Sequence, residues 1–191
     1  MESTTYLLIG GGLASSQAAK QLRQLNAQGT ITLVTEDPHA PYDHPPLSKD
    51  FLRGEITKEK VFFDDPSFYA AQEIELILNT AVTTLDPALK TATLADGRSI
   101  RFEKALIATG GRPVHPKIPG TDLPGVHYLR TLNDCLGLDA DATPGSMAVL
   151  IGAGFIGLEV AASLTQRGVQ VTVVETGPHI WPRFADEALA R

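Results

Sequence analysis

Residues 6–15 read YLLIGGGLAS, and residues 149–157 read VLIGAGFIG. In each stretch a short apolar run enters a glycine turn, and apolar residues at helical spacing follow it. A β-branched run comes next in both cases, at residues 30–34 and 169–174, and an acidic residue stands at its end. This order predicts a strand, a tight turn, a helix and a second parallel strand, twice in one chain.

The spacing suits the pyrophosphate of a dinucleotide. The first glycine allows the tight turn, the second lets the backbone approach the phosphates, and the third position keeps the helix close to the strand. The phosphates then lie at a helix N-terminus, where free N–H groups and the helix dipole favour negative charge. Glu36 and Glu175, 24 residues after Gly12 and 21 after Gly154, are the expected ribose ligands. Ser15 stands at the third-glycine position, and two ordinary glycine turns in a plain α/β domain are the alternative interpretation.

The composition excludes several classes of protein. A chain of 191 residues with 43% hydrophobic and 20% charged residues is globular, and its length fits one large or two small domains. The net charge of −6 argues against a nucleic-acid binder. One cysteine, Cys135, excludes a disulfide framework and a Cys-based zinc site, and it favours the reducing cytoplasm. The five histidines lack metal-ligand spacing, and no stretch suits a membrane span or a signal peptide.

The region between the two repeats predicts shorter elements. Its prolines favour a short helix over residues 47–52, and a linker over residues 112–124. Further elements are expected as follows: a helical turn at 68–72, strands at 74–78, 81–85, 91–94 and 99–102, a buried strand from 104 that ends at a glycine turn, and the start of a helix at 186–190. The predicted fold class is α/β, with Rossmann-like parallel sheets, a small antiparallel β meander and an incomplete second dinucleotide domain.

Three further motifs carry a resemblance to a known family. They read PYDHPPLSK at 41–49, ATGGRP at 108–113 and LRT at 129–131, and Glu159 follows in the second repeat. Across essentially the whole chain, the sequence resembles the flavoprotein ferredoxin reductases of oxygenase electron-transfer chains and the related apoptosis-inducing-factor-like oxidoreductases. The resemblance implies an FAD-binding domain at 1–115, a connecting segment at 116–146 and the start of an NAD(P)-binding domain at 147–191.

The resemblance also assigns the site residues. Those expected at FAD are Gly10, Gly12, Leu13, Ala14, Ser15, Glu36, His44, Pro45, Lys49, Val82, Ala108, Thr109, Gly110 and Arg130. Those expected at the nicotinamide nucleotide are Gly152, Gly154, Phe155, Ile156, Gly157 and Glu175. His44 stands where the family usually has arginine, so a contact that needs a permanent positive charge is not carried over.

Lys49 and Glu159 are the expected catalytic pair. Accepting a hydride places negative charge on a flavin, and a nearby ammonium stabilises that charge in a site with little water. Glu159 would keep Lys49 charged and oriented. Taken alone, a lysine after a proline loop is more often an ordinary solvated side chain.

The route of the electrons follows from the cysteine count. No cysteine occurs at residues 43–49, where disulfide-reductase relatives place a redox pair, so reducing equivalents are expected to leave to an external acceptor. The resemblance implies a small iron–sulfur protein such as a ferredoxin. The expected function is hydride transfer from NADH to FAD, followed by electron transfer to that acceptor. The alternatives are a nucleotide-binding interaction protein of the apoptosis-inducing-factor type with slow redox turnover, and an inactive truncated fragment.

Glu175 favours NADH over NADPH. A carboxylate at this position accepts a hydrogen bond from the 2′-hydroxyl of NAD and repels a 2′-phosphate. Residues 176–182 contain no lysine or arginine that would attract that phosphate. The 45 residues from Met147 onward are too few for a full dinucleotide domain. The chain is therefore expected to be the N-terminal portion of a longer reductase or a natural truncation, and by itself to bind FAD poorly and to aggregate or form a homodimer.

Overall fold

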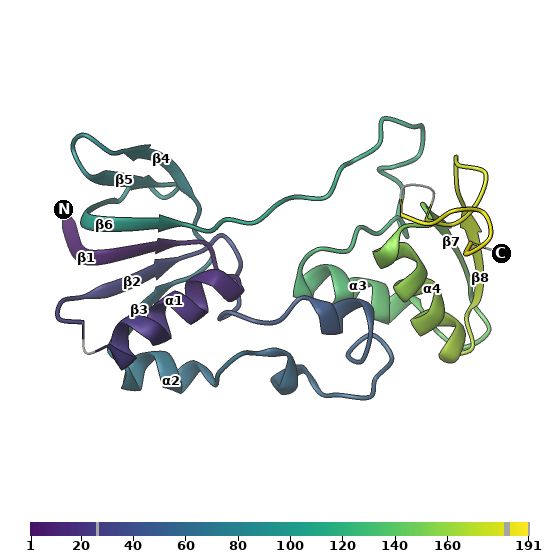
Figure 1. Cartoon of the computed structure of the whole chain (residues 1–191), viewed down its shortest axis with the longest axis horizontal. Coiled ribbons are helices and arrows are strands. Elements are labelled where there is room, and N and C mark those ends of the chain that lie inside the picture. The colour runs from purple at the N-terminus through teal and green to yellow at the C-terminus, as the bar shows by residue number, and fades with distance from the viewer. Residues whose placement is uncertain (26, 182–183, 191) are drawn as a thin grey trace. The chain divides into compact units, whose positions relative to one another are not determined.

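The computed structural model describes residues 1–25, 27–181 and 184–190, and the chain is drawn in Figure 1. By their contacts the residues form two compact units. One comprises Met1–Asp43 and Phe62–Gly111, and the other comprises His44–Val61 and Arg112–Arg191. The chain therefore leaves the first unit after β2 and returns to it before α2.

A single six-stranded sheet forms the first unit, in the order β3-β2-β1-β6-β5-β4. Its strands are β1 (Glu2–Ile9), β2 (Ile31–Val34), β3 (Ile74–Ile77), β4 (Val82–Asp86), β5 (Thr91–Leu94) and β6 (Ser99–Ile107). The pairs β3–β2, β2–β1 and β1–β6 are parallel, and the pairs β6–β5 and β5–β4 are antiparallel. The predicted parallel sheet and β meander are therefore confirmed, as two parts of one sheet.

The core of this unit explains the apolar runs. Leu7 and Leu8 are adjacent in β1 and both are buried, because successive side chains of a strand point to opposite faces of the sheet. Leu7 packs with Val34 and Phe102, whereas Leu8 packs with residues of two helices, α1 (Leu13–Gln24) and α2 (Pro66–Ala71). Both faces of the sheet are thus covered at the end of β1, which is why residues 7–9 form a continuous apolar run rather than an alternating one.

Two predictions about β6 are wrong. The strands expected at 99–102 and from 104 onward are one continuous strand, because β1 pairs with β6 from Ile100 to Ile107. The second half of β6 was expected to be buried, yet residues 103–107 are exposed, and Ile107 keeps 63% of its accessible surface. The antiparallel neighbour β5 reaches only to Arg101, so the last residues of β6 pair with β1 alone within the described chain.

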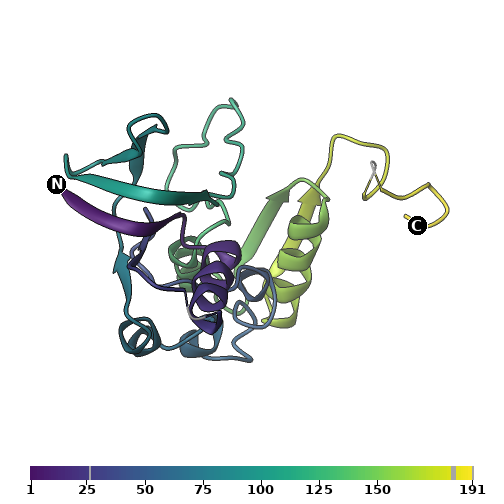
Figure 2. The same ribbon diagram turned by 60° about the vertical axis from the view of Figure 1, so that its left-hand side comes forward.

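In the second unit, two parallel strands carry one helix. These are β7 (Met147–Ile151), α4 (Phe155–Gln166) and β8 (Gln170–Val174), and Figure 2 shows α4 lying along the two strands. A further helix, α3 (Leu132–Asp141), precedes them. Sequence analysis missed α3 and treated its residues as part of a connecting segment. Its start carries a capping box, in which Thr131 and Asp134 each accept from the other's backbone N–H.

The short helices differ from the predictions. The helix expected at 47–52 is a 3₁₀-helix, η1 (Pro45–Ser48), which begins earlier because Pro45 and Pro46 fit the first helical positions. A second 3₁₀-helix, η2 (Lys58–Val61), was not predicted. The helix start expected at 186–190 is only a turn, closed by one hydrogen bond from the Ala190 N–H to the Asp186 carbonyl. Over the described residues, no helix has the length and apolar character needed to cross a membrane.

Candidate functional site

The two glycine turns have the same backbone geometry. Gly10 has φ of +115° and Gly152 has φ of +103°, values that side chains with a Cβ rarely adopt. The Gly10 N–H donates to the Val34 carbonyl at 2.8 Å, and the Gly152 N–H donates to the Val174 carbonyl at 2.8 Å. Each turn is therefore tied to the end of the second strand of its repeat.

The second glycine of each motif is the N-cap of the following helix. Gly12 and Gly154 are extended, and neither helix receives a hydrogen bond from a side-chain cap. A Cβ placed on Gly12 or Gly154 would meet no atom of the described residues within 4 Å, the adjacent residues of the chain apart. The helix starts are thus open, and the first turns hold the predicted residues Leu13, Ala14 and Ser15 in α1 and Phe155, Ile156 and Gly157 in α4.

The third position differs between the repeats. A Cβ on Gly157 would lie 2.2 Å from the Gly152 carbonyl oxygen, so glycine is required there by close packing. Ser15 occupies the equivalent place in α1 and is fully buried, and no partner for its hydroxyl is found among the described residues. A buried hydroxyl without a partner costs free energy unless a ligand oxygen or a water molecule satisfies it. This favours a polar ligand at the start of α1, as a pyrophosphate would be.

The two acids after the second strands are held differently. Glu36 is exposed at the end of β2. The carboxylate of Glu175 accepts from the backbone N–H groups of Ala153, at 2.8 Å, and Gly177, at 2.9 Å, and from the hydroxyl of Thr176 at 3.0 Å. These hydrogen bonds lower the pKa of Glu175 to about 2. Glu175 therefore carries a fixed negative charge beside the second glycine turn.

Ala108, Thr109 and Gly110, which are also assigned to FAD, follow the end of β6 beside the first glycine turn. Ala108 follows β6, and its N–H donates to the Ile9 carbonyl at 2.8 Å. A Cβ on Gly10 would come within 2.2 Å of the Ala108 carbonyl oxygen, so the ATGG motif abuts the first glycine turn. Thr109 and Gly110 are exposed just beyond it, and Val82 is half-buried at the start of β4.

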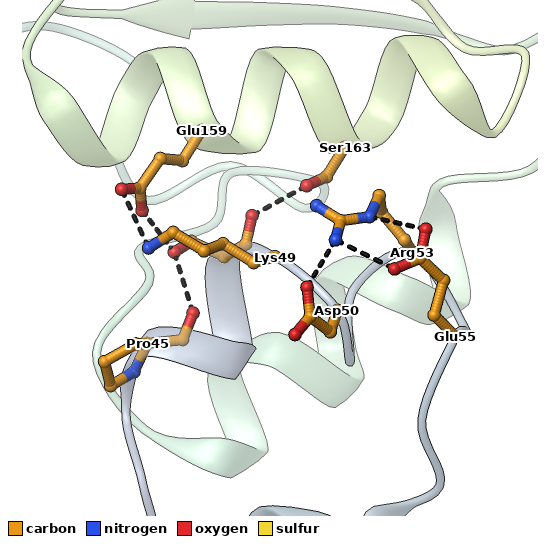
Figure 3. A network of polar contacts seen from close by, with 8 residues as sticks. Pro45, Lys49, Asp50, Arg53, Glu55, Glu159 and Ser163 are labelled. Carbon is orange, nitrogen blue, oxygen red and sulfur yellow. Dashed lines mark hydrogen bonds and ion pairs between the residues drawn. The ribbon is translucent and has the colours of Figure 1, made fainter.

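Lys49 and Glu159 meet in the second unit. The Lys49 Nζ lies 2.8 Å from the Glu159 Oε1, and Figure 3 shows Glu159 extending from α4 toward Lys49. Hydrogen bonds from Lys49 and then from Ser48 lower the pKa of the Glu159 carboxyl, which is therefore ionised at neutral pH. The predicted pairing of Lys49 with Glu159 is present in the geometry, with each side chain about one-third exposed.

A pocket surrounds this ion pair. Its lining comes from three parts of the second unit: the segment with η1, the residues before α3, and the first turns of α4. The residues are His44, Pro45, Leu47, Ser48, Lys49, Leu129, Arg130, Ile156 and Glu159. His44, Pro45 and Arg130, which were assigned to FAD, thus lie with the ion pair of Lys49 and Glu159, whereas the residues from Gly10 to Glu36 and from Val82 to Gly110 belong to the first unit.

Three residues that sequence reasoning did not assign to the site hold the backbone around Lys49. Cys135 in α3 donates to the Leu47 carbonyl at 3.2 Å, and the Ser163 hydroxyl in α4 donates to the Ser48 carbonyl at 2.7 Å. Arg167 donates to the Leu52 carbonyl at 2.9 Å. No local sequence signal identifies these contacts, because they join residues 88 to 115 positions apart. No group of three potential metal ligands occurs among the described residues.

Comparison with known proteins identifies the family. A family model described as pyridine nucleotide-disulphide oxidoreductase matches residues 4–191, which is nearly the whole chain. The chain belongs to this family. Its α/β fold and its two glycine turns are those expected of an FAD-dependent oxidoreductase, and the resemblance to ferredoxin reductases is confirmed.

Several known proteins are similar to this chain. Rhodocoxin reductase of Rhodococcus erythropolis is 40% identical over 171 residues, 90% of this chain and 40% of the relative. Rubredoxin-NAD(+) reductase of Pseudomonas putida is 35% identical over 184 residues, 96% of this chain and 48% of the relative. The crystal structure of a covalent putidaredoxin reductase–putidaredoxin complex matches with a TM-score of 0.89 and 33% identity, covering all of this chain and 46% of that one. The chain thus spans less than half the length of these relatives.

Proposed function

We propose that the protein is a flavoprotein oxidoreductase that takes a hydride from NADH onto FAD and passes electrons to a small iron–sulfur protein. The observation that carries this proposal is the pair of equivalent glycine turns at Gly10–Gly12 and Gly152–Gly154. Each has an open helix start of the kind that binds a pyrophosphate. Two such starts in one chain suit one flavin nucleotide and one nicotinamide nucleotide.

We assign FAD to the first repeat, within residues 1–115, and NADH to the second, within residues 147–191. The hydroxyl of Ser15, which has no partner among the described residues, and the open space at Gly12 suit the FAD pyrophosphate. Residues 116–146 connect the two. The fixed negative charge of Glu175 supports NADH over NADPH, because a carboxylate repels a 2′-phosphate and accepts from a 2′-hydroxyl.

Lys49 and Glu159 act together in this proposal. Bound FAD would supply the hydride-accepting ring system, on which reduction places negative charge. The Lys49 ammonium stabilises that charge, and the ionised Glu159 holds the ammonium in place beside the pocket. Both side chains are partly exposed, so their attraction is screened by water, and their contribution is orientation more than binding energy.

The cysteine content of these 191 residues supports an external electron acceptor. Cys135 is the single cysteine of the chain and is buried, so the chain offers no disulfide to receive the electrons. The similar structure of putidaredoxin reductase is a complex with putidaredoxin, and another relative is named for rubredoxin. These relatives support a small iron–sulfur protein as the acceptor.

The test uses the full-length product of the reading frame loaded with FAD. NADH added without oxygen should bleach the flavin absorbance, and an oxidised ferredoxin added next should restore it. Lys49→Met should slow the bleaching at least tenfold while FAD stays bound, since one well-placed charge is worth more than about 1.4 kcal/mol of barrier. A protein that binds FAD but is never reduced by NADH or NADPH would overturn the proposal. Reduction without transfer to any iron–sulfur protein would overturn the proposed acceptor.

A further inference from the structure

Ser48 makes two contacts with one face of α4. Its hydroxyl donates to the Glu159 Oε2 at 2.6 Å, and its carbonyl accepts from the Ser163 hydroxyl at 2.7 Å. Glu159 and Ser163 are four residues apart, so they lie one above the other on the same side of the helix. Figure 3 shows both side chains extending from α4 toward the segment that carries Lys49.

The carboxylate of Glu159 is fixed by one donor on each oxygen. Lys49 contacts Oε1 at 2.8 Å and Ser48 contacts Oε2 at 2.6 Å. The Ser48 hydroxyl also lies 3.2 Å from the Pro45 carbonyl, but it has one proton, and the shorter contact to a charged acceptor is the stronger one. Without Ser48 the carboxylate would be free to rotate about its last bond, and Lys49 would lose a defined partner.

The Ser163 hydroxyl contacts neither Lys49 nor Glu159 in this network and acts through the backbone of Ser48. The Ser48 carbonyl belongs to the peptide group that joins Ser48 to Lys49, so the bond from Ser163 sets the orientation of that peptide. Both serines are buried, with 5% and 0% of their surface accessible, and a hydrogen bond in such surroundings is poorly replaced by water. Cys135 and Arg167 hold the carbonyls of the flanking residues Leu47 and Leu52.

We propose that Ser48 is a positioning residue for Lys49: its hydroxyl holds the Glu159 carboxylate in the orientation that presents one oxygen to the Lys49 ammonium, and Ser163 fixes Ser48 in turn. The effect of Ser48 on reduction by NADH rests on the proposed function. Its effect on the orientation of the Glu159 carboxylate does not, because it involves only residues of this chain. The other titratable groups that line the pocket are His44 and Arg130, and Arg167 follows Ser163 as the C-cap of α4.

The test follows the Glu159 carboxyl by NMR in the full-length product of the reading frame. In Ser48→Ala the midpoint of the Glu159 titration should shift upward, because one of the two hydrogen bonds that stabilise the ionised form is gone. Ser48→Thr keeps the hydroxyl and should restore the midpoint. Ser163→Ala should give a smaller upward shift. Ser146→Ala is the matched control, since its hydroxyl donates only to the Thr143 carbonyl, and it should leave the midpoint unchanged.

A variant that fails to fold leaves the proposal testable. Ser48→Cys preserves the size of the side chain but is a weaker donor, so its midpoint must lie above that of the wild type. An unmoved midpoint in folded Ser48→Ala or Ser48→Cys overturns the proposal. In the FAD-loaded full-length protein, Ser48→Ala should slow reduction by NADH about tenfold, the loss expected for one hydrogen bond to a charged group. If no variant and no wild type is reduced, the proposed function fails while the Glu159 shift still decides the role of Ser48.

Discussion

The backbone N–H of Ala153 donates to the Oε2 of Glu175 at 2.8 Å, so the carboxylate at the end of β8 is bound to the middle of the second glycine turn. The same carboxylate accepts from the Gly177 N–H and the Thr176 hydroxyl. One side chain thus fixes the turn after β7 and the loop after β8. Ionisation of Glu175 is therefore linked to the order of the whole second repeat.

The first prediction concerns pH. The pKa of Glu175 is lowered from 4.5 to about 2 in the folded chain, chiefly by the Ala153 N–H. A folded-state pKa below the unfolded one stabilises the protein above the unfolded pKa, and the effect is lost as the pH falls from 4.5 toward 2. Glu175→Gln should therefore lower stability to urea at about pH 7, and the difference from wild type should shrink at about pH 3. Glu103→Gln, on the exposed part of β6, removes the same charge and serves as the control. A constant difference at both pH values would contradict the linkage.

The second prediction concerns the choice of nucleotide. Glu175→Arg replaces a carboxylate that repels a 2′-phosphate with a cation that attracts one, so kcat/KM for NADPH relative to NADH should rise at least tenfold in the full-length protein. Glu175→Gln separates loss of repulsion from gain of attraction and should give an intermediate ratio. If the arginine variant keeps the wild-type ratio of kcat/KM values for NADPH and NADH, the Glu175 side chain does not contact the ribose.

The third prediction compares two glycines of the first turn. Gly10→Ala places a Cβ 2.2 Å from the Ala108 carbonyl oxygen at a φ of +115°, and it should destabilise the fold by about 1–3 kcal/mol. Gly12→Ala meets no atom within 4 Å and should cost less than about 1 kcal/mol. Because the added methyl occupies the open side of the helix start, Gly12→Ala should weaken FAD binding at least tenfold, as measured by quenching of flavin fluorescence. Wild-type affinity in Gly12→Ala would show that FAD does not bind there.

The fourth prediction concerns Cys135. Burial raises the pKa of its thiol to about 12, and its Sγ donates to the Leu47 carbonyl. The thiolate is the reactive form, so iodoacetamide should leave Cys135 unmodified in the native chain at about pH 8 and modify it fully in denaturant. Alkylation of the native chain as fast as that of the denatured chain would mean that α3 does not hold η1.

Local patterns predicted most of the first unit and both glycine turns. Glycines such as Gly10 and Gly152 are fixed by a backbone conformation, and the strands by runs of buried apolar residues, so each can be read from neighbouring positions. The family resemblance pointed to Lys49 and Glu159, which the structure brings together. Local patterns do not predict burial that depends on a distant element. Ile107, at the exposed end of β6, is the example.

The residues that hold the backbone around Lys49 could not be predicted from local sequence patterns either. Ser163 looks like any serine within a helix, and its contact with Ser48 exists only because α4 packs against η1. Likewise Cys135 reads as an ordinary buried thiol until its bond to the Leu47 carbonyl is seen. Only α3 had a sequence signal that was overlooked, the spacing of Thr131 and Asp134 in a capping box.

The segment His44–Val61 belongs by its contacts to the second unit, although in the sequence it lies between the two parts of the first unit. A chimera that exchanges only the part after Gly111 with a homologous reductase would therefore keep Lys49 from one parent and take Glu159 and Ser163 from the other. Recombination between such genes keeps the ion pair and the serine hydroxyls that hold it together only under one condition. The short segment His44–Val61 must be transferred together with the part after Gly111. The residues that form this ion-pair site are thus encoded in two separate stretches of the gene.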